Sequence, residues 1–329
     1  MKPQIIAEIS ANHNGSLDTA LELVAKCAKA GASAIKLQTW TPDRMVVDPT
    51  LVVQSGPWKG WNMMEMYRKA HTPWEWHQPI FDLAKAKGMD AFSSVFDRGA
   101  LDFLESIGCP RYKIASFECT DIPLIEAVAS TKKPMIISTG MANWPEIIAA
   151  ITAAQTFGCH DITMLKCTSA YPAPASSANL KTMQRFLGHA KFGLSDHTMG
   201  IGVAIAAVAL GASMIEKHVT LSRKAPGLDS AFSAEPADLK RLVDGCNDAY
   251  DALGNQEFGL DPAENDQRKF RRSWYAIKDV KNGQRLQMDN IATARPTGGM
   301  LPSDYRKLLN RKAKRTIKAG EAINTGMLR

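Results

Sequence analysis

The sequence predicts an α/β fold: a (β/α)8 barrel, also called a TIM barrel, followed by a small β-rich domain. Short apolar and β-branched runs alternate with helical patterns up to about residue 253. Eight such runs occur within about 250 residues, the usual size of this barrel. After residue 272 the pattern changes to short alternating segments, at residues 273–278, 292–295 and 313–317, which are separated by glycine turns. A doubly wound open sheet is the competing layout, and the number of runs favours the barrel.

The eight expected strands are short and mostly apolar, as buried parallel strands are. In chain order they cover residues 5–10, 34–38, 91–94, 112–115, 135–139, 162–166, 192–194 and 214–218. Helical stretches between them end at glycines suited to a left-handed C-cap, such as Gly31 and Gly88. Residues 201–210 form an uncharged helical connection between the last two strands.

These patterns divide the chain into three segments. We expect a barrel domain over residues 1–255, a polar linker over 256–272 and a β-rich domain over 273–329. Residues 266–329 hold 16 Lys and Arg against 5 Asp and Glu, whereas the first 265 residues hold 24 against 28. A basic module of this kind binds nucleic acid, docks on an acidic neighbour or covers an anionic substrate.

The composition argues against several classes of protein. No apolar run reaches the ~18 residues that a membrane span needs. The first residues lack the pattern of a signal peptide, and the six cysteines form no Cys-x-x-Cys pair. We therefore expect reduced thiols and a cytoplasmic protein. Glycine-rich loops of the Walker or dinucleotide-binding type are absent from the sequence.

Two histidines stand at corresponding places in the pattern. His197 and His218 each follow or end a short apolar run, and the helical residues 201–210 separate them. A strand, a crossover helix and a strand would bring both imidazoles to the same rim of a parallel sheet. Two neutral imidazoles there suit a divalent metal ion. The alternative is that backbone groups satisfy both rings.

Two lysines, Lys36 and Lys113, lie inside expected strands. A buried ammonium group must be paired or must meet an anion, because its removal from water is costly. With the serines at the strand ends, the lysines suit a substrate that carries phosphate and carboxylate groups. Pairing with Glu8, Glu118 or Glu216 is the alternative. A Schiff-base lysine, as in barrel aldolases, is a second functional interpretation.

The connection after the second strand is rich in aromatic residues. It contains Trp58 and Trp61, and the next helical stretch begins with Trp74 and Trp76. Such rings either stack on a sugar or an acyl group or simply pack the loop against its helix.

Seven short motifs carry most of the polar residues expected at the strand ends. They occur in one order along the chain, and a glycine-containing loop follows them in the C-terminal segment. These motifs resemble those of the sialic acid synthase family, the phosphoenolpyruvate-dependent nonulosonate synthases. The resemblance spans nearly the whole chain, and its last part is similar to the family's C-terminal antifreeze-like (SAF) domain. The motifs are Ala7-Glu-Ile-Ser-Ala-Asn-His13-Asn-Gly15, Lys36-Leu-Gln-Thr39, Lys113-Ile-Ala-Ser116-Phe-Glu118, Ser138-Thr-Gly140-Met, Ser169-Ala-Tyr171-Pro-Ala-Pro, Gly193-Leu-Ser-Asp-His197-Thr and Glu216-Lys-His218, with the loop Arg295-Pro-Thr-Gly-Gly299.

The resemblance implies a function for particular residues. It implies that His197 and His218 bind Mn²⁺ or Mg²⁺ and act in catalysis together with Glu8, Lys36 and Lys113. The residues implied around phosphoenolpyruvate are the two lysines with Ser94, Ser116, Ser138, Ser169 and Ser195. Those implied around the amino sugar are Glu8, Glu118, Tyr171 and Asp229. Arg295 would reach an acetamido group from the SAF domain of the other subunit in a domain-swapped homodimer.

Several segments are most similar to the branch of the family that makes pseudaminic acid from 2,4-diacetamido-2,4,6-trideoxy-altrose. They include Thr72-Pro-Trp-Glu-Trp-His77 and Ser169-Ala-Tyr-Pro-Ala-Pro174. The implied reaction condenses this sugar with phosphoenolpyruvate, cleaves a C–O bond and releases phosphate. N-acetylneuraminate and legionaminate synthases are the alternatives within the family. Nucleic-acid binding by the basic tail is the alternative outside it, although the tail has few aromatic residues and no recognised nucleic-acid-binding motif.

Overall fold

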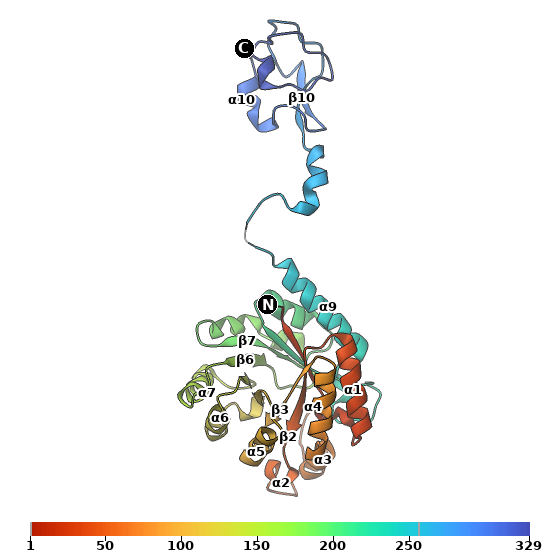
Figure 1. Ribbon diagram of the computed structural model, residues 1–329, viewed down its shortest axis with the longest axis vertical. Helices are drawn as coiled ribbons and strands as arrows, with labels where there is room; N and C mark the ends of the chain where they lie inside the picture. Colours follow the sequence, from red (N-terminus) through yellow and green to blue (C-terminus); the bar gives the residue numbers. More distant parts are fainter. Residues whose placement is uncertain (1, 256) are drawn as a thin grey trace. The chain divides into compact units, whose positions relative to one another are not determined.

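The computed structural model describes residues 2–255 and 257–329. The chain divides into two compact units, Met1–Gly254 and Asn255–Arg329. Residues 1 and 256, which begin the expected barrel domain and linker, lie outside the described residues. The first unit is a closed barrel of eight parallel strands with helices around it (Figure 1). The closure confirms the predicted barrel over the doubly wound open sheet.

The strands follow one another around the barrel in sequence order, and β8 closes on β1 with His218 beside Glu8. Each expected strand recurs, with its ends shifted by at most two residues. The strands are almost wholly buried, since side chains fill the barrel interior and helices cover its outer face. They are β1 (Gln4–Glu8), β2 (Ala34–Thr39), β3 (Asp90–Val95), β4 (Tyr112–Ile114), β5 (Met135–Ser138), β6 (Ile162–Cys167), β7 (Lys191–Asp196) and β8 (Met214–His218).

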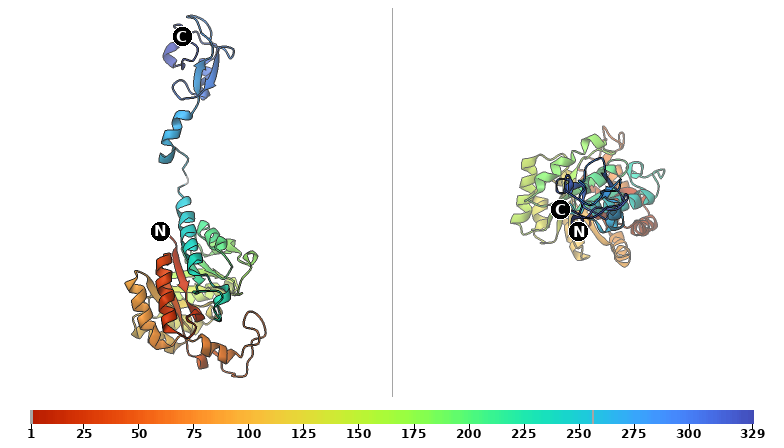
Figure 2. Two further views of the ribbon diagram at one scale, coloured as in Figure 1. Left: turned by 90° about the vertical axis from the view of Figure 1, so that its right-hand side faces the viewer. Right: turned by 90° about the horizontal axis from the view of Figure 1, so that it is seen from above.

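Helices form most of the connections and cover the outside of the strands (Figure 2). The first begins where the Ser16 hydroxyl accepts a hydrogen bond from the Thr19 backbone, and it ends at Gly31, whose φ is 92°. No helix in the described part of the chain is long and apolar enough to cross a membrane. The helices are α1 (Leu17–Ala30), α2 (Pro42–Met45), α3 (Met63–Ala70), α4 (His77–Ala86), α5 (Arg98–Ser106), α6 (Ile122–Ala129), α7 (Trp144–Thr156), α8 (Gly202–Ala209) and α9 (Pro236–Ala252), with 3-10 turns η1 (Ser10–His13), η2 (Trp74–Trp76), η3 (Ser116–Glu118) and η6 (Ser230–Phe232).

One connection departs from the simple alternation. Between β6 and β7 the chain forms two 3-10 segments, η4 (Ala175–Ser177) and η5 (Leu180–Phe186), in place of an α-helix. Pro172 and Pro174 lack the backbone N–H that an α-helix would use, and Asn179 adopts a φ of 45°. This irregular segment brings Tyr171 to the barrel mouth.

Strands β7 and β8 approach each other closely at Gly193. A Cβ atom at this position would lie 2.2 Å from the carbonyl oxygen of Met214. Glycine is therefore a requirement of this strand pair. His197 directly follows β7, and His218 is the last residue of β8.

The second unit has a hydrophobic core of its own, which includes Trp274, Ile291 and Ile317. Strands β9 (Ser273–Ala276) and β10 (Ile291–Ala294) pair antiparallel, whereas the expected segment 313–317 forms only isolated bridges. Part of the expected linker is a 3-10 helix without buried residues. The remaining elements are η7 (Pro262–Phe270), η8 (Pro302–Asp304), α10 (Tyr305–Leu308) and η9 (Thr325–Met327).

Candidate active site

Two lysines and two glutamates from different strands meet inside the barrel. Lys36 Nζ lies 2.6 Å from Glu8 Oε2 and donates a hydrogen bond to Ser94 Oγ at 2.9 Å. Glu216 Oε1 lies 3.6 Å from Lys36 Nζ and 3.4 Å from Lys113 Nζ. The four charged side chains are at most 5% exposed. Both lysines are thus paired with carboxylates.

The charges in this group compensate one another unevenly. Burial opposes ionisation of Glu216, but Lys113 and Lys36 outweigh it and lower the pKa of this carboxyl. Burial also opposes the charge of Lys36, yet Glu216 and Glu8 raise its pKa. For Lys113 burial prevails and its pKa is lowered, since the Glu216 oxygen that faces it is shared with Lys36. Lys113 is the cation that gains most from a further anion.

The two histidines lie side by side at the ends of two neighbouring strands. His197 directly follows β7, His218 ends β8, and their ring centroids lie 5.4 Å apart. Nδ1 of His197 lies 2.9 Å from the carbonyl oxygen of Thr168. A carbonyl only accepts, so Nδ1 donates and Nε2 of the neutral ring is free to bind a metal. Tyr171 packs against both rings, at centroid distances of 4.3 and 6.1 Å.

The histidine pair could hold a metal ion. Nδ1 of His218 is buried without a hydrogen-bond partner, and Asp229 Oδ2 lies 3.6 Å from it. An unpaired buried ring nitrogen is suited to an ion or a ligand. Within residues 2–255 and 257–329, no three or more His, Cys, Asp or Glu side chains are grouped to hold a metal ion. The two imidazoles would therefore leave the other positions of an ion to water and substrate.

Serines supply hydroxyl groups around the lysines. Ser169 Oγ donates a hydrogen bond to Ser116 Oγ at 2.8 Å. Gly140 allows this arrangement, because a Cβ atom there would lie 2.6 Å from the Ser116 Cβ, and its φ is 50°. Ser195 donates to the glutamate oxygen that the lysines share, at 3.2 Å. The hydroxyl of Ser138 is buried and has no hydrogen-bond partner in the described structure.

Two carboxyl groups expected near the sugar have different environments. Burial raises the pKa of Glu118 to about 7, and its Oε2 has no hydrogen-bond partner among the described residues. Burial also opposes ionisation of Asp229, but His218 and a 2.6 Å hydrogen bond from the Ser10 hydroxyl lower its pKa. At neutral pH Asp229 is therefore charged, whereas Glu118 is divided between its charged and its protonated form.

Trp58, in the connection after β2, contacts two aromatic rings that themselves pack against the histidines. Trp58 packs against Tyr171 and Phe232, at centroid distances of 5.3 and 6.1 Å. Its indole N–H donates to the carbonyl oxygen of Leu228 at 3.0 Å. This bond ties the loop between α2 and α3 to the segment that carries Asp229.

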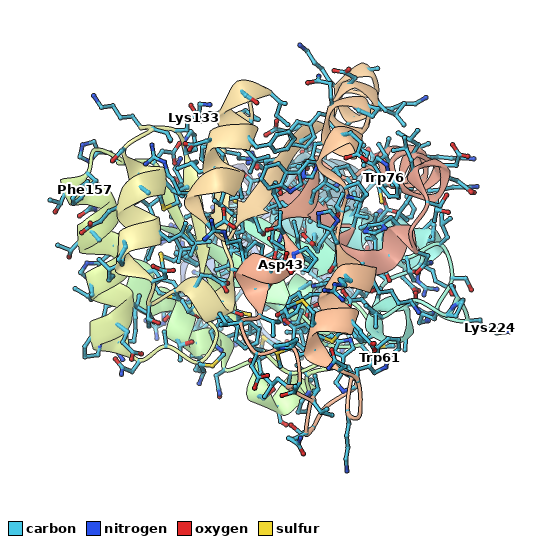
Figure 3. All side chains as sticks on the ribbon, turned by 90° about the horizontal axis from the view of Figure 1, so that it is seen from below. Asp43, Trp61, Trp76, Lys133, Phe157 and Lys224 are labelled. Atoms are coloured by element: carbon cyan, nitrogen blue, oxygen red, sulfur yellow. The ribbon has the colours of Figure 1, made fainter. Side chains whose placement is uncertain are left out.

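The other tryptophans of this region have separate surroundings. Trp61 lies beneath the ammonium group of Lys69, 5.1 Å away, and Trp74 stacks on Phe103. Trp61 and Trp76 occupy different places on the barrel (Figure 3). Trp61 and Trp74 thus pack against neighbouring side chains of their own region. Trp58 differs from them, because it packs against the aromatic rings beside the histidines.

Glu216, one of the three carboxylates that the sequence offered as partners of the lysines, pairs with both of them, and it lies two residues before His218 on the same face of β8. Sequence reasoning missed two other neighbours of the histidines. Cys167 Sγ lies 3.9 Å from His197 Nδ1; burial opposes its ionisation, but His197 lowers its pKa to about 7. Phe232 lies 5.9 Å from His218, between ring centroids, on a turn with no periodic signal.

Arg295 lies at the end of the second unit's β10 and is exposed. Its implied contact with an acetamido group stays a prediction.

Comparison with known proteins agrees with the resemblance drawn from the motifs. A pseudaminic acid synthase of Helicobacter pylori is 43% identical over 98% of this chain and 96% of its own. An N,N′-diacetyllegionaminic acid synthase of Legionella pneumophila is 34% identical over 97% of this chain and 92% of its own. The crystal structure of an N-acetylneuraminic acid (sialic acid) synthetase from Leptospira borgpetersenii, in complex with citrate, superposes with a TM-score of 0.74. It is 30% identical and covers 81% of this chain and 90% of its own.

Two family models divide the chain between them. The NeuB family model matches residues 23–258, and the SAF domain model matches residues 271–329. The first match includes β2 to β8 and both histidines, and the second includes β9 and β10. The chain therefore belongs to the NeuB family and carries a SAF domain at its C-terminus.

Proposed function

We propose that this chain catalyses the pseudaminic acid synthase reaction. It condenses phosphoenolpyruvate with 2,4-diacetamido-2,4,6-trideoxy-altrose, with C–O cleavage and release of phosphate. The observation that carries the proposal is the meeting of two buried lysines and a histidine pair in one barrel mouth. The higher identity to a pseudaminic than to a legionaminic relative supports this choice of sugar. We place the reaction in the cytoplasm, which suits six free, buried thiols.

The lysines bind the anionic groups of phosphoenolpyruvate in this proposal. Glu216 compensates the positive charge of Lys113 only in part, because it also pairs with Lys36. A phosphate or carboxylate group beside Lys113 therefore supplies the missing negative charge. The buried hydroxyl of Ser138 gains an acceptor at the same time. Ser94, Ser116, Ser169 and Ser195 complete the ring of hydroxyl groups. These groups are held by the fold before substrate arrives, as electrostatic catalysis requires.

The remaining residues act on the sugar and on protons. His197 and His218 would hold Mn²⁺ or Mg²⁺, which when bound supplies Lewis-acid polarisation of the sugar aldehyde. C3 of phosphoenolpyruvate attacks the aldehyde carbon, whose oxygen takes a proton; water adds at C2, and phosphate leaves with the C–O electrons. Glu8, which accepts a hydrogen bond from Gln38 at 2.9 Å, positions the water or takes its proton. Glu118, Tyr171 and Asp229 contact the sugar.

A comparison of sugars tests the proposal. Phosphate release from phosphoenolpyruvate is measured with the altro-configured diacetamido sugar, the legionaminic precursor and N-acetylmannosamine. We expect efficient release with the first, loss of release in chelator and recovery with Mn²⁺ or Mg²⁺. Release only with N-acetylmannosamine would overturn the choice of sugar. Full activity in chelator, with borohydride trapping substrate on the enzyme, would indicate a Schiff-base aldolase instead.

We further propose that two copies form a domain-swapped homodimer in which Arg295 serves the partner's barrel. The supporting observations are the separate core of the basic second unit and the exposure of Arg295. Arg295→Ala and Lys113→Met variants should each be inactive alone. Co-production should restore activity, because one barrel then receives an intact lysine and an intact arginine. Absence of recovery in a mixed dimer would contradict the swap.

A further inference from the structure

Lys217 and Asp196 form a buried ion pair on the two strands that carry the histidines. Lys217 Nζ lies 2.6 Å from Asp196 Oδ2, and the side chains are 4% and 1% exposed. The two residues are register partners on β8 and β7. Each immediately precedes one of the histidines. Because successive side chains of a strand alternate, the pair lies on the outer face, toward the helices, behind the barrel mouth.

The pair continues into the backbone around His197. Lys217 Nζ also donates to the carbonyl oxygen of Thr198 at 2.6 Å. Asp196 Oδ1 accepts from the backbone N–H of Thr198 at 2.9 Å and from its hydroxyl at 2.7 Å. The residues on both sides of His197 are thereby bound to the residue before His218. We call Lys217, Asp196 and Thr198 the clasp.

The proposed reaction does not use the clasp directly, and a buried ion pair is by itself weak evidence of a contribution to stability. Replacement of a buried ion pair by uncharged residues of similar volume is often neutral or stabilising. The clasp instead links the ends of β7 and β8. In the proposed function these two strand ends place the imidazoles of His197 and His218 around one metal ion. A misplacement of such ligands by about 1 Å is enough to weaken a site strongly.

We propose that the clasp is a positioning device for the metal: it fixes the separation of the His197 and His218 imidazoles from the outer face of the strands. The proposal rests on the metal assignment within the proposed function. Its residues touch neither substrate nor reacting atoms. Loss of groups that orient metal ligands typically lowers metal affinity about 10- to 100-fold, and the same range is expected here.

The surroundings of the clasp offer a conservative variant. A cavity of about 260 Å³ adjoins Lys217 and Thr198 and is also lined by Asp238 and Leu242. It gives room for a longer side chain at position 217. Lys217→Arg therefore keeps the ionic link, whereas Lys217→Met removes it and leaves the Asp196 charge buried. The double variant Asp196→Asn/Lys217→Met removes both charges, and the Asn oxygen still accepts from Thr198.

The test measures binding of Mn²⁺ to the full-length protein without substrate, from the electron paramagnetic resonance signal of the free ion. Thermal unfolding is followed in parallel to show that each variant is folded. We expect the double variant to melt cooperatively but to bind Mn²⁺ at least about tenfold more weakly. Lys217→Arg should restore affinity to near the wild-type value. The matched control is Asp161→Asn/Lys191→Met, which removes a 2.8 Å pair at the opposite end of the strands and should leave Mn²⁺ affinity unchanged.

Two results would overturn the proposal. One is a double variant whose melting temperature falls while its Mn²⁺ affinity stays within twofold of wild type, which would make the clasp purely structural. The other is a wild-type protein that binds no Mn²⁺. Phosphate release by the wild type is scored separately. A weaker Mn²⁺ site in the variant would therefore support the clasp even if no tested sugar reacted.

Discussion

The ammonium groups of Lys36 and Lys113 share a single carboxylate oxygen, Oε1 of Glu216, at 3.6 and 3.4 Å. Lys36 has a second carboxylate in Glu8, 2.6 Å away. Lys113 has no other ion pair in the described parts of the chain. Glu216 therefore pairs with one cation from β2 and one from β4 in the barrel interior.

Glu216→Gln should be destabilised by about 3–5 kcal/mol, because the change leaves Lys113 buried without its counter-ion. Unfolding in urea measures the loss. Phosphoenolpyruvate should raise the melting temperature of this variant more than that of wild type, since the substrate anion replaces the missing charge. Glu8→Gln is the control, because there both lysines keep Glu216. Equal ligand shifts in all three proteins would contradict the proposed anion site.

Lys113→Met should lower kcat/KM for phosphoenolpyruvate at least about 100-fold, the usual effect of removing one preorganised group that stabilises developing charge. The rate of phosphate release below KM measures it. Lys191→Met, at the amino-terminal end of the same barrel, removes an exposed cation and should leave the rate unchanged. A loss confined to KM at full kcat would show that Lys113 binds substrate without aiding the transition state.

Trp58→Ala should raise KM for the diacetamido sugar about tenfold or more with little change in KM for phosphoenolpyruvate. Its ring packs on Tyr171 and Phe232, and its N–H holds the chain beside Asp229, so its loss loosens the sugar side of the site. Steady-state kinetics with each substrate varied in turn gives both constants. Trp61→Ala in the same loop is the comparison and should leave both constants unchanged. A parallel rise in both constants for Trp58→Ala would indicate general collapse of the mouth.

Glu118→Gln should stabilise the protein at pH 8 and have little effect at pH 5. Burial raises the pKa of this carboxyl to about 7, so the folded state binds its proton more tightly than the unfolded chain does. Wild-type stability therefore falls as pH rises through the interval from the unfolded pKa to 7, and Gln avoids this loss. The difference reaches at most about 3.5 kcal/mol, at ~1.4 kcal/mol per unit of pKa. Melting temperatures across this range measure it, and a constant difference would refute the assignment.

Most of the fold could be predicted because its signal is local. Most of the parallel strands are short apolar runs followed by a helix, and several of these helices end at a glycine such as Gly31. The sequence placed β8 at its observed bounds, Met214–His218. The connection between β6 and β7 could not be predicted as 3-10, because its composition still allows a helix after Pro174. The split of residues 313–317 into bridges likewise depends on long-range pairing.

The sequence predicts which residues make up the candidate site better than it predicts how those residues contact one another. Strand ends identify His197, His218 and the lysines, since alternation fixes which residues face the mouth. The sequence left open whether the lysines are paired, and the structure pairs both with carboxylates. Trp58 reaches Leu228 across 170 positions of the chain, and no local pattern encodes such a contact.

Gly193 also limits which amino-acid substitutions this barrel tolerates. Its missing side chain lets β7 and β8 come together beside Met214, the first residue of β8, and any Cβ atom would meet the Met214 carbonyl. A saturation library across β7 should therefore return a single amino acid at position 193 and a broad spectrum at exposed Lys191, two residues earlier. Closure of the barrel thus fixes the identity of a residue that lies toward the opposite end of the strands from His218.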